Sequence, residues 1–483
     1  MNYRTVINII GKVLCVEAMF LLPALILSLI LHEREAITGI LVTMAVAAAL
    51  GFPLSRVRGR RPDIFARDGL VTVGLAWLAV SLVGALPFCV SGAIPSYIDA
   101  LFETASGFTT TGATILREIE SLPRGLLYWR SFTHWLGGMG VLVFLLALNP
   151  LSRKDSGENM HLLRAESPGV RASKLVPRMR DSASILYLIY IGLTGLEFLL
   201  LLLGRVPVFD SLTLAFGTAG TGGFTIRNDS AASYSPYAQW VLIVFMFLFS
   251  VNFNVYFLLL MRQVKKALRS SELHCFAGVF AFATLLFVLN TRSYFPDFWD
   301  GLRHSAFTTV SLMSTTGFVT TNFDLWPQIS RSLMILLMFM GACAGSTGGG
   351  MKVVRVQLLF KSAYRSLYRA VHPNAVRLVH LDGERVDEPT VRSVDGFLLI
   401  YFLTVAAAGF LISADGFSFE TNFSAALSCM SNVGPGLGGV GAVECYAGFS
   451  DFSKLVLTVT MLIGRLEIYP MLALALPGVW KGK

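Results

Sequence analysis

Long runs of apolar residues limit what this chain can fold into more than any other feature. The runs at 19–31, 136–148, 196–203, 241–249 and 333–340 lie inside mostly apolar windows of about 20 residues. A helix of about 20 residues rises about 30 Å, which is the thickness of the hydrocarbon core of a bilayer. Charged residues make up only 14% of the chain, against about 25% in soluble domains. The sequence therefore predicts an all-α polytopic membrane protein.

The placement of positive charge predicts the orientation of the spans. We expect ten crossings, near residues 7–31, 37–55, 70–91, 126–149, 183–203, 237–261, 274–291, 331–360, 394–413 and 454–478. Lys and Arg gather in alternate inter-span segments, for example at 153–180 and 352–392. By the positive-inside rule these segments and both termini are cytoplasmic. The net charge of +9 thus indicates a cytoplasmic face able to meet anionic lipid or an acidic partner, and nucleic-acid binding is not expected.

A unit of roughly a hundred residues occurs four times. Each unit is a span, a short segment that opens with an acidic residue, a glycine loop and a second span. The short segments are 99–113, 210–224, 300–319 and 420–437, opening with Asp99, Asp210, Asp300 and Glu420. Aligned on their closing glycines they read TTG at 110–112, GTG at 220–222, TTG at 315–317 and NVG at 432–434. These glycines are 110, 95 and 117 residues apart, so we predict four structural repeats.

The short segments are expected to enter the membrane and return. An acidic first residue can cap free N–H groups and complement the positive end of the helix dipole. About ten helical residues span only about 15 Å, half the hydrocarbon thickness. Because irregular backbone at that depth must be buried in protein or line a cavity, four such loops imply one central cavity with pseudo-fourfold symmetry. The predicted segments are a two-helix unit at 1–68, repeats at 69–150, 183–263, 264–360 and 393–483, and cytosolic basic linkers at 151–182 and 361–392.

The chemistry of these loops suits a cation that loses its hydration shell. Backbone carbonyls aimed at one axis can replace that shell, glycine permits the required dihedrals, and the negative helix ends add stabilisation. The predicted filter residues are Thr110, Thr111, Gly112, Gly220, Thr221, Gly222, Thr315, Thr316, Gly317, Asn432, Val433 and Gly434. No metal ligand set or nucleophile–base pair is evident, and the six cysteines are scattered, so an enzyme is not expected.

A glycine-rich stretch interrupts the predicted span 331–360. Three consecutive glycines each cost a helix about 1 kcal/mol relative to alanine, so a break is expected there. Its polar residues lie at membrane depth, which favours a gate over a packing kink. Arg465 in the last span is expected to face the pore as an electrostatic barrier, the alternative being a structural salt bridge. The predicted gate residues are Gly345, Ser346, Thr347, Gly348, Gly349, Gly350, Lys352 and Arg465.

Two other interpretations remain open. Glycines in membrane helices are often packing points between helices, which is the structural explanation for any single loop. A secondary transporter, coupled to ions or protons and carrying another cation or small solute, also uses broken helices. His134 is expected to be an interfacial histidine at the head of a span or one with satisfied hydrogen bonds.

The loops together resemble those of the Trk/Ktr/HKT potassium transporters, and most closely the bacterial TrkH type. The matching stretches are SGFTTTGAT at 106–114, GGF at 222–224, STTGF at 314–318, NVGPGLG at 432–438, GSTGGGMK at 345–352 and GRLEI at 464–468. The resemblance implies K⁺ uptake across the bacterial cytoplasmic membrane, four span–pore helix–span repeats behind an N-terminal helix pair, and a homodimer with one pore per subunit. It also implies a gating role for the 345–352 stretch, a cytosolic nucleotide-binding regulator of the TrkA type, and no cofactor on this chain itself. In such families a serine in place of the first filter glycine tends to admit Na⁺, so the four glycines here imply a preference for K⁺.

Overall fold

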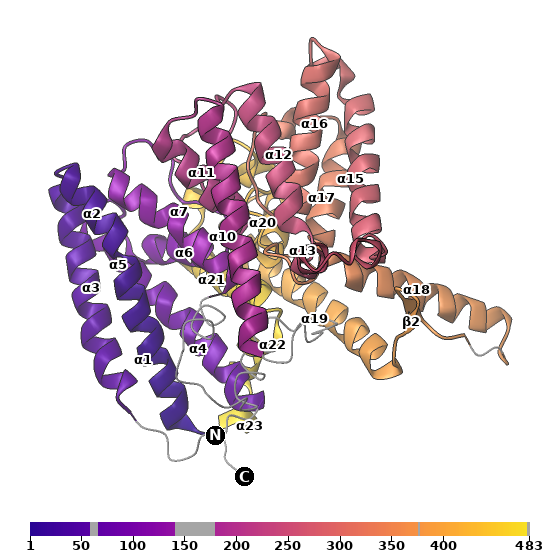
Figure 1. Cartoon of the computed structure of the whole chain (residues 1–483), viewed down its shortest axis with the longest axis horizontal. Helices are drawn as coiled ribbons and strands as arrows, with labels where there is room; N and C mark the ends of the chain where they lie inside the picture. Colours follow the sequence, from indigo (N-terminus) through magenta and orange to yellow (C-terminus); the bar gives the residue numbers. More distant parts are fainter. Residues whose placement is uncertain (58–65, 141–178, 375–376, 481–483) are drawn as a thin grey trace.

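The computed structural model describes residues 1–57, 66–140, 179–374 and 377–480. The chain is almost entirely helical over these ranges (Figure 1). The predicted linker at 151–182 lies almost wholly outside the described residues, and so does the end of the predicted span 126–149. The predicted all-α class is confirmed.

An N-terminal helix pair packs against the first repeat. Helices α1 (Tyr3–Phe20) and α2 (Leu22–Ile30) run in one direction and α3 (Arg34–Ser55) returns beside them. The crossing is tight because glycines lie in it: a Cβ on Gly11 would lie 2.3 Å from the backbone nitrogen of Ser55, and one on Gly51 2.9 Å from the carbonyl oxygen of Gly11. Small residues allow such close backbone approach in membranes.

Four units follow, each with a long helix, a short helix, a loop and a second helix. The first contains α4 (Ala66–Gly84), α5 (Leu86–Val90), α6 (Tyr97–Phe108) and α7 (Arg124–Met139), and the second contains α10 (Met179–Leu203), α11 (Val208–Gly220), α12 (Pro236–Ser250) and α13 (Phe253–Leu260). The third contains α14 (Val264–Ala267), α15 (Ser271–Asn290), α16 (Phe298–Met313), α17 (Gln328–Met340) and α18 (Val353–Val371). The fourth contains α19 (Glu388–Ile412), α20 (Phe419–Ser431), α21 (Asp451–Arg465), α22 (Tyr469–Ala475) and α23 (Pro477–Trp480). Short 3₁₀ turns lie at Arg292–Tyr294, Phe323–Leu325, Ser413–Asp415, Gly438–Val440 and Tyr446–Gly448.

The second helix of each unit ends or breaks inside the molecule. Six helices of the described residues are long and apolar enough to cross a membrane, and the pair α12 and α13 would make a seventh span, bent by 89°. The predicted spans 237–261 and 454–478 each contain a break that the sequence did not predict, between α12 and α13 and between α21 and α22. The structure confirms the predicted break in span 331–360, between α17 and α18.

Local backbone chemistry explains these breaks. After α7 the chain turns at Gly140, whose φ is 77°, and after α17 it turns at Gly341, whose φ is 69°. Asn252 caps α13 by accepting a hydrogen bond from the Asn254 N–H at 2.9 Å. Between α21 and α22, Ile468 takes a φ of 74°, which is costly for a β-branched residue and is tolerated where the surroundings enforce it. The broken ends converge below the loops.

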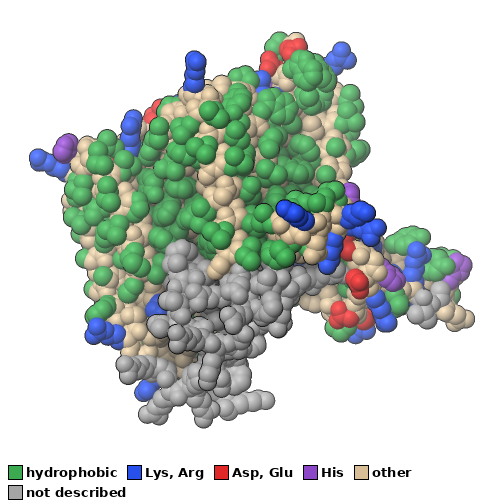
Figure 2. All heavy atoms as spheres, viewed as in Figure 1, with side chains coloured by type: hydrophobic (Ala, Val, Ile, Leu, Met, Phe, Trp, Pro, Cys, Tyr) green, Lys and Arg blue, Asp and Glu red, His purple; other side chains and the backbone are tan. Residues whose placement is uncertain are grey.

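The outer surface carries a broad apolar region. Figure 2 shows hydrophobic side chains covering most of the visible face, with Lys and Arg concentrated near its borders. Exposed apolar residues such as Leu188 (69%), Leu203 (75%) and Leu289 (64%) fit contact with lipid. Helix α18 projects from the body beside a small hairpin of β1 (His380–Leu381) and β2 (Glu384–Arg385), which pair antiparallel with Leu381 opposite Glu384 (Figure 1).

Candidate ion pathway

Four short helices, α6, α11, α16 and α20, point their C-termini at the loops. Each carries its predicted acidic residue in the first turn. The cap hydrogen bonds, however, are made by Ser96, Asp297 and Ser418, whereas α11 begins after Pro207 with no side-chain cap. The predicted capping role of the acidic residues is therefore wrong, and their place beside the positive helix end remains favourable.

The acidic residues instead form ion pairs, three of them with residues outside their own helix and one, Asp300–Arg303, within α16. The pairs are Asp99–Lys454 at 2.5 Å, Asp210–Arg227 at 2.9 Å, Asp300–Arg303 at 2.8 Å and Glu420–Arg331 at 2.7 Å. Lys454 belongs to α21, so its pair joins the fourth unit to the first. Tyr234 also donates to Asp210 at 3.0 Å, and burial, followed by the charge of Asp210, raises the pKa of Tyr234.

The four loops share one backbone conformation. In each, a residue with φ between 54° and 60° follows the short helix, and a glycine with φ between 79° and 98° comes two residues later. These pairs are Thr110 and Gly112, Thr221 and Gly223, Thr315 and Gly317, and Asn432 and Gly434. The residue between them donates its N–H to the carbonyl five residues earlier, at 2.8, 2.8, 2.9 and 3.0 Å respectively.

This pattern corrects the predicted alignment of the second loop by one residue. The equivalent triplet is Thr221, Gly222 and Gly223, and Gly220 is the last residue of α11. The sequence alignment used the wrong glycine because three glycines lie within four positions, at 220, 222 and 223. The other three predicted triplets keep their register.

The loops form a closed ring in which each glycine faces the carbonyl of the next loop. A Cβ on Gly112 would lie 2.0 Å from the oxygen of Gly222, and one on Gly223 would lie 1.9 Å from that of Thr316. The ring continues from Gly317 to the Val433 oxygen at 2.1 Å and closes from Gly434 to the Thr111 oxygen at 2.7 Å. No side chain fits at these contacts without a shift of the neighbouring backbone. The four units are therefore arranged cyclically around one axis, as the repeats predict.

Side chains behind the ring differ from loop to loop. The hydroxyls of Thr109 and Thr111 lie 2.7 Å apart, as do those of Ser314 and Thr316. In the fourth loop the Asn432 amide donates to the Thr111 hydroxyl at 2.9 Å and so links the first and fourth loops. The second loop has glycine at 220 and 222, the two positions that correspond to these hydroxyls.

The stretch 341–352 lies directly beneath the ring. The Gly349 N–H donates to the Thr315 hydroxyl at 2.7 Å, and a Cβ on Gly348 would lie 2.8 Å from the Ser314 oxygen. The Thr347 hydroxyl donates to the Phe249 carbonyl at 3.2 Å. The predicted gate residues thus lie together between the ring and the broken second helices, with Thr347, Gly348 and Gly349 buried and Gly345 exposed.

Arg465 lies at the end of α21 and contacts the backbone of two other segments. Its guanidinium donates to the carbonyl of Thr347 at 2.8 Å, to that of Gly138 at 3.0 Å, and to that of Gly137. It therefore connects the 341–352 stretch to the end of α7. Glu467 pairs with Arg355 of α18.

The sequence did not predict a role for Glu272 in this region. Its carboxylate accepts the N–H of Ala344 at 2.7 Å and that of Val354 at 3.3 Å, and so connects the stretch to the first turn of α18. In the sequence it is an acidic residue at the start of a span, which ordinarily indicates only a helix start. Among the described residues, no group of three or more His, Cys, Asp or Glu could hold a metal ion.

The fold and the ring define a polytopic membrane protein with four re-entrant loops around one axis. The chain belongs to the TrkH family of cation transport proteins, whose model matches residues 32–295 and 298–478. It is a transport protein and not an enzyme.

Curated relatives and a solved structure cover the whole chain. The Trk system potassium uptake protein TrkH of Salmonella typhimurium is 34% identical, and the Trk system potassium uptake protein TrkG of Escherichia coli is 29% identical. The alignments cover 100% of both chains in the first case and 99% of both in the second. The crystal structure of the potassium transporter TrkH from Vibrio parahaemolyticus superposes with a TM-score of 0.89 at 31% identity, covering 100% of both chains.

Proposed function

We propose that this protein takes up K⁺ across the bacterial cytoplasmic membrane through the ring of four loops. The observation that carries the proposal is the closed contact of Gly112, Gly223, Gly317 and Gly434 with the carbonyls of neighbouring loops. Backbone carbonyls held around one axis can replace the water of a K⁺ ion. The names of the relatives, which are potassium uptake proteins, agree with this choice of cation.

The proposed filter consists of the residue with left-handed backbone, the next residue and the glycine in each loop. These are Thr110, Thr111 and Gly112; Thr221, Gly222 and Gly223; Thr315, Thr316 and Gly317; and Asn432, Val433 and Gly434. K⁺ enters from outside, passes the ring, and then meets the 341–352 stretch and Arg465. Inward movement gains about 2.3 kcal/mol per charge for each 100 mV of membrane potential.

The 341–352 stretch and Arg465 together form the proposed gate. The stretch contacts the base of the ring through Gly349 and Thr315, so it must move before a cation can leave. Arg465 holds it through the Thr347 carbonyl and places a positive charge on the exit path. Both effects slow the passage of cations.

The wider organisation follows from the same proposal. The repeats extend over 69–150, 183–263, 264–360 and 393–483, behind the two-helix unit 1–68, and the linkers 151–182 and 361–392 are cytoplasmic. Both termini are cytoplasmic, and the Tyr3 hydroxyl donates to the Trp480 carbonyl at 2.6 Å, which supports their lying on one side. The chain forms a homodimer in the lipid membrane and binds a cytosolic TrkA-type regulator, which carries the nucleotide.

Ion flux into liposomes tests the proposal. The purified protein is reconstituted, and uptake of ⁸⁶Rb⁺, a tracer for K⁺, is measured with and without competing Na⁺. We expect Rb⁺ uptake that K⁺ blocks and that equal Na⁺ leaves nearly unchanged. Uptake that depends on a proton gradient, or transport of a different solute in place of Rb⁺, would instead favour a secondary transporter.

A further inference from the structure

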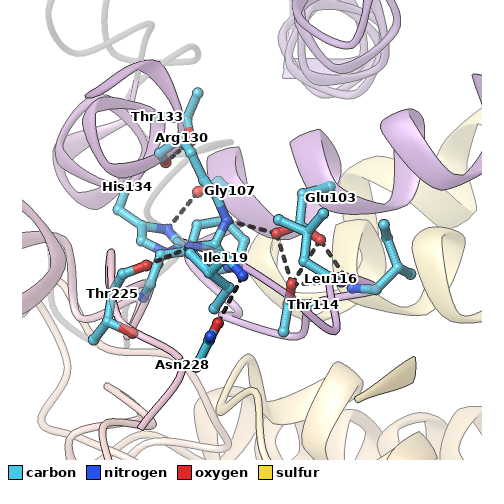
Figure 3. Close-up of polar contacts among 12 residues, drawn as sticks. Glu103, Gly107, Thr114, Leu116, Ile119, Arg130, Thr133, His134, Thr225 and Asn228 are labelled. Carbon is cyan, nitrogen blue, oxygen red and sulfur yellow. Dashed lines mark hydrogen bonds and ion pairs between the residues drawn. The ribbon is translucent and has the colours of Figure 1, made fainter. Parts of the chain in front are cut away.

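A buried polar cluster lies behind the first and second loops (Figure 3). It consists of Glu103 on α6 and of Arg130 and His134 on α7, which are 1%, 2% and 0% exposed. Buried polar groups, and charges above all, are costly unless they are paired and hydrogen-bonded. The contacts of the three side chains therefore show which parts of the backbone the cluster holds in place.

Arg130 and Glu103 join the outer ends of the two loops. Arg130 donates to Glu103 at 2.6 Å and to the Thr225 carbonyl at 2.8 Å, and its guanidinium lies 3.5 Å from the ring centre of Phe224. Glu103 accepts the Thr114 hydroxyl at 2.9 Å and the Ile115 N–H at 3.0 Å, as Figure 3 shows in part. Thr114 and Ile115 follow the first loop, whereas Phe224 and Thr225 follow the second. The ion pair thus connects one loop to the other.

His134 makes a second connection, closer to the ring. Its Nδ1 lies 2.8 Å from the Gly107 carbonyl, and its Nε2 accepts the N–H of Phe224 at 3.2 Å. A carbonyl can only accept and an N–H can only donate, so the neutral tautomer with its proton on Nδ1 satisfies both. A Cβ on Gly222 would lie 2.2 Å from the imidazole Nδ1, so glycine at 222 makes room for His134.

The other three units have different residues at the equivalent positions. Counted from the start of each second helix, His134 corresponds to Met246, Met338 and Met461, and Arg130 to Leu242, Met334 and Leu457. Counted back from the loop glycine, Glu103 corresponds to Leu214, Thr308 and Ala425. Glycines support the first count: a Cβ on Gly137 would lie 1.9 Å from the Phe108 oxygen, and one on Gly464 2.1 Å from the equivalent Met430 oxygen.

We propose that Glu103, Arg130 and His134 are positioning residues that set the spacing of the first and second loops and thereby the preference of the ring for K⁺ over Na⁺. The inference rests on the proposed function. Cation selectivity has been attributed both to cavity size and to the number and field strength of the carbonyls, and each depends on where the carbonyls are held. The second loop lacks the hydroxyls present behind the first and third, so His134 supplies the support that they provide there.

The test replaces His134 by the residue of the other three units. His134→Met keeps a side chain that α12, α17 and α21 accommodate, but it leaves the Gly107 carbonyl and the Phe224 N–H without their partner. In liposomes we expect the ratio of Rb⁺ flux to Na⁺ flux to fall about tenfold, which is the size of effect that the loss of one buried hydrogen bond produces. Rb⁺ flux itself should persist. His134→Gln, which can both donate and accept, should recover part of the ratio. Met338→Leu, at the equivalent position of α17, is the matched control and should leave it unchanged.

The outcomes separate this inference from the proposed function. If the wild-type protein carries no Rb⁺, the proposed function fails; if it is selective and His134→Met is equally selective, the inference fails.

Glu103→Gln offers a second measurement by thermal unfolding, should His134→Met not fold. We expect the increase in Tm that K⁺ produces over Na⁺ to shrink in Glu103→Gln. An equal fall of Tm in both salts would indicate a merely structural ion pair and overturn the inference.

Discussion

Gly223 decides between the two alignments of the second loop. Its φ is 79° and a Cβ there would lie 1.9 Å from the Thr316 carbonyl oxygen, so alanine must displace the backbone of the third loop. We expect Gly223→Ala to reduce Rb⁺ flux into liposomes by at least about a hundredfold, because misplaced carbonyls no longer replace the water of the ion. Gly192→Ala is the control, since a Cβ at that position of α10 meets nothing within 4 Å. Normal flux in a folded Gly223→Ala protein would contradict the proposed ring.

Arg465 combines a charge with a structural contact, and two variants separate them. A unit charge about 10 Å from a cation, at an effective dielectric constant of about 20, raises its energy by about 1.7 kcal/mol. We therefore expect Arg465→Ala to increase Rb⁺ flux several-fold, up to roughly twentyfold. Arg465→Lys keeps the charge but loses the two guanidinium nitrogens that donate to the carbonyls of Thr347 and Gly138. It should therefore increase Rb⁺ flux less than Arg465→Ala does. Unchanged or lower flux in folded Arg465→Ala would rule out the barrier.

Glu272 connects the 341–352 stretch to the first turn of α18, since its carboxylate accepts the N–H groups of Ala344 and Val354. Hydrogen bonds to a charged acceptor contribute about 1.5–3 kcal/mol and neutral ones about 0.5–1.5 kcal/mol. Glu272→Gln should weaken the contacts with Ala344 and Val354 and raise Rb⁺ flux by roughly fivefold, through easier opening. His274→Gln, two residues along the same helix and exposed, serves as the control. A decrease in flux would show that Glu272 stabilises the open arrangement instead.

The sequence predicted some elements well and others poorly, for physical reasons. The short helices and loops could be predicted because acidic residues, apolar length and glycines recur in one order. The break between α12 and α13 was not predicted, because Ser250, Asn252 and Asn254 are isolated polar residues in an apolar run and the bend also depends on contacts such as the Phe253 N–H with the Gly345 carbonyl at 2.9 Å. His134 was expected to be interfacial or to have satisfied hydrogen bonds, and the second alternative is confirmed, since it is the eleventh residue of α7, fully buried and bonded through both ring nitrogens. Only the packing of α7 against the second loop reveals its partners.

At the scale of the whole molecule, the four repeats and the uneven distribution of Lys and Arg together predict one orientation of the protein in the membrane. The cyclic contacts place the four loop glycines around one axis, and the order of the repeats was enough to predict this arrangement. The direction of that axis across the membrane depends on charge, because the positive-inside rule assigns the basic segments to the cytoplasm. The hairpin of β1 and β2 and the segment after the fourth loop should therefore lie on opposite sides of the membrane.

Cysteine labelling tests this orientation with one position on each side. Val443 follows the fourth loop and is 69% exposed, and Glu384 is exposed on β2. We expect a membrane-impermeant maleimide to label Val443→Cys in intact cells and Glu384→Cys only after permeabilisation. The parent chain sets the background, since its partly exposed cysteines, such as Cys445, can also react. The reverse pattern would place the basic segments outside, and K⁺ would then enter the ring from the cytoplasm, which is incompatible with uptake along the proposed route.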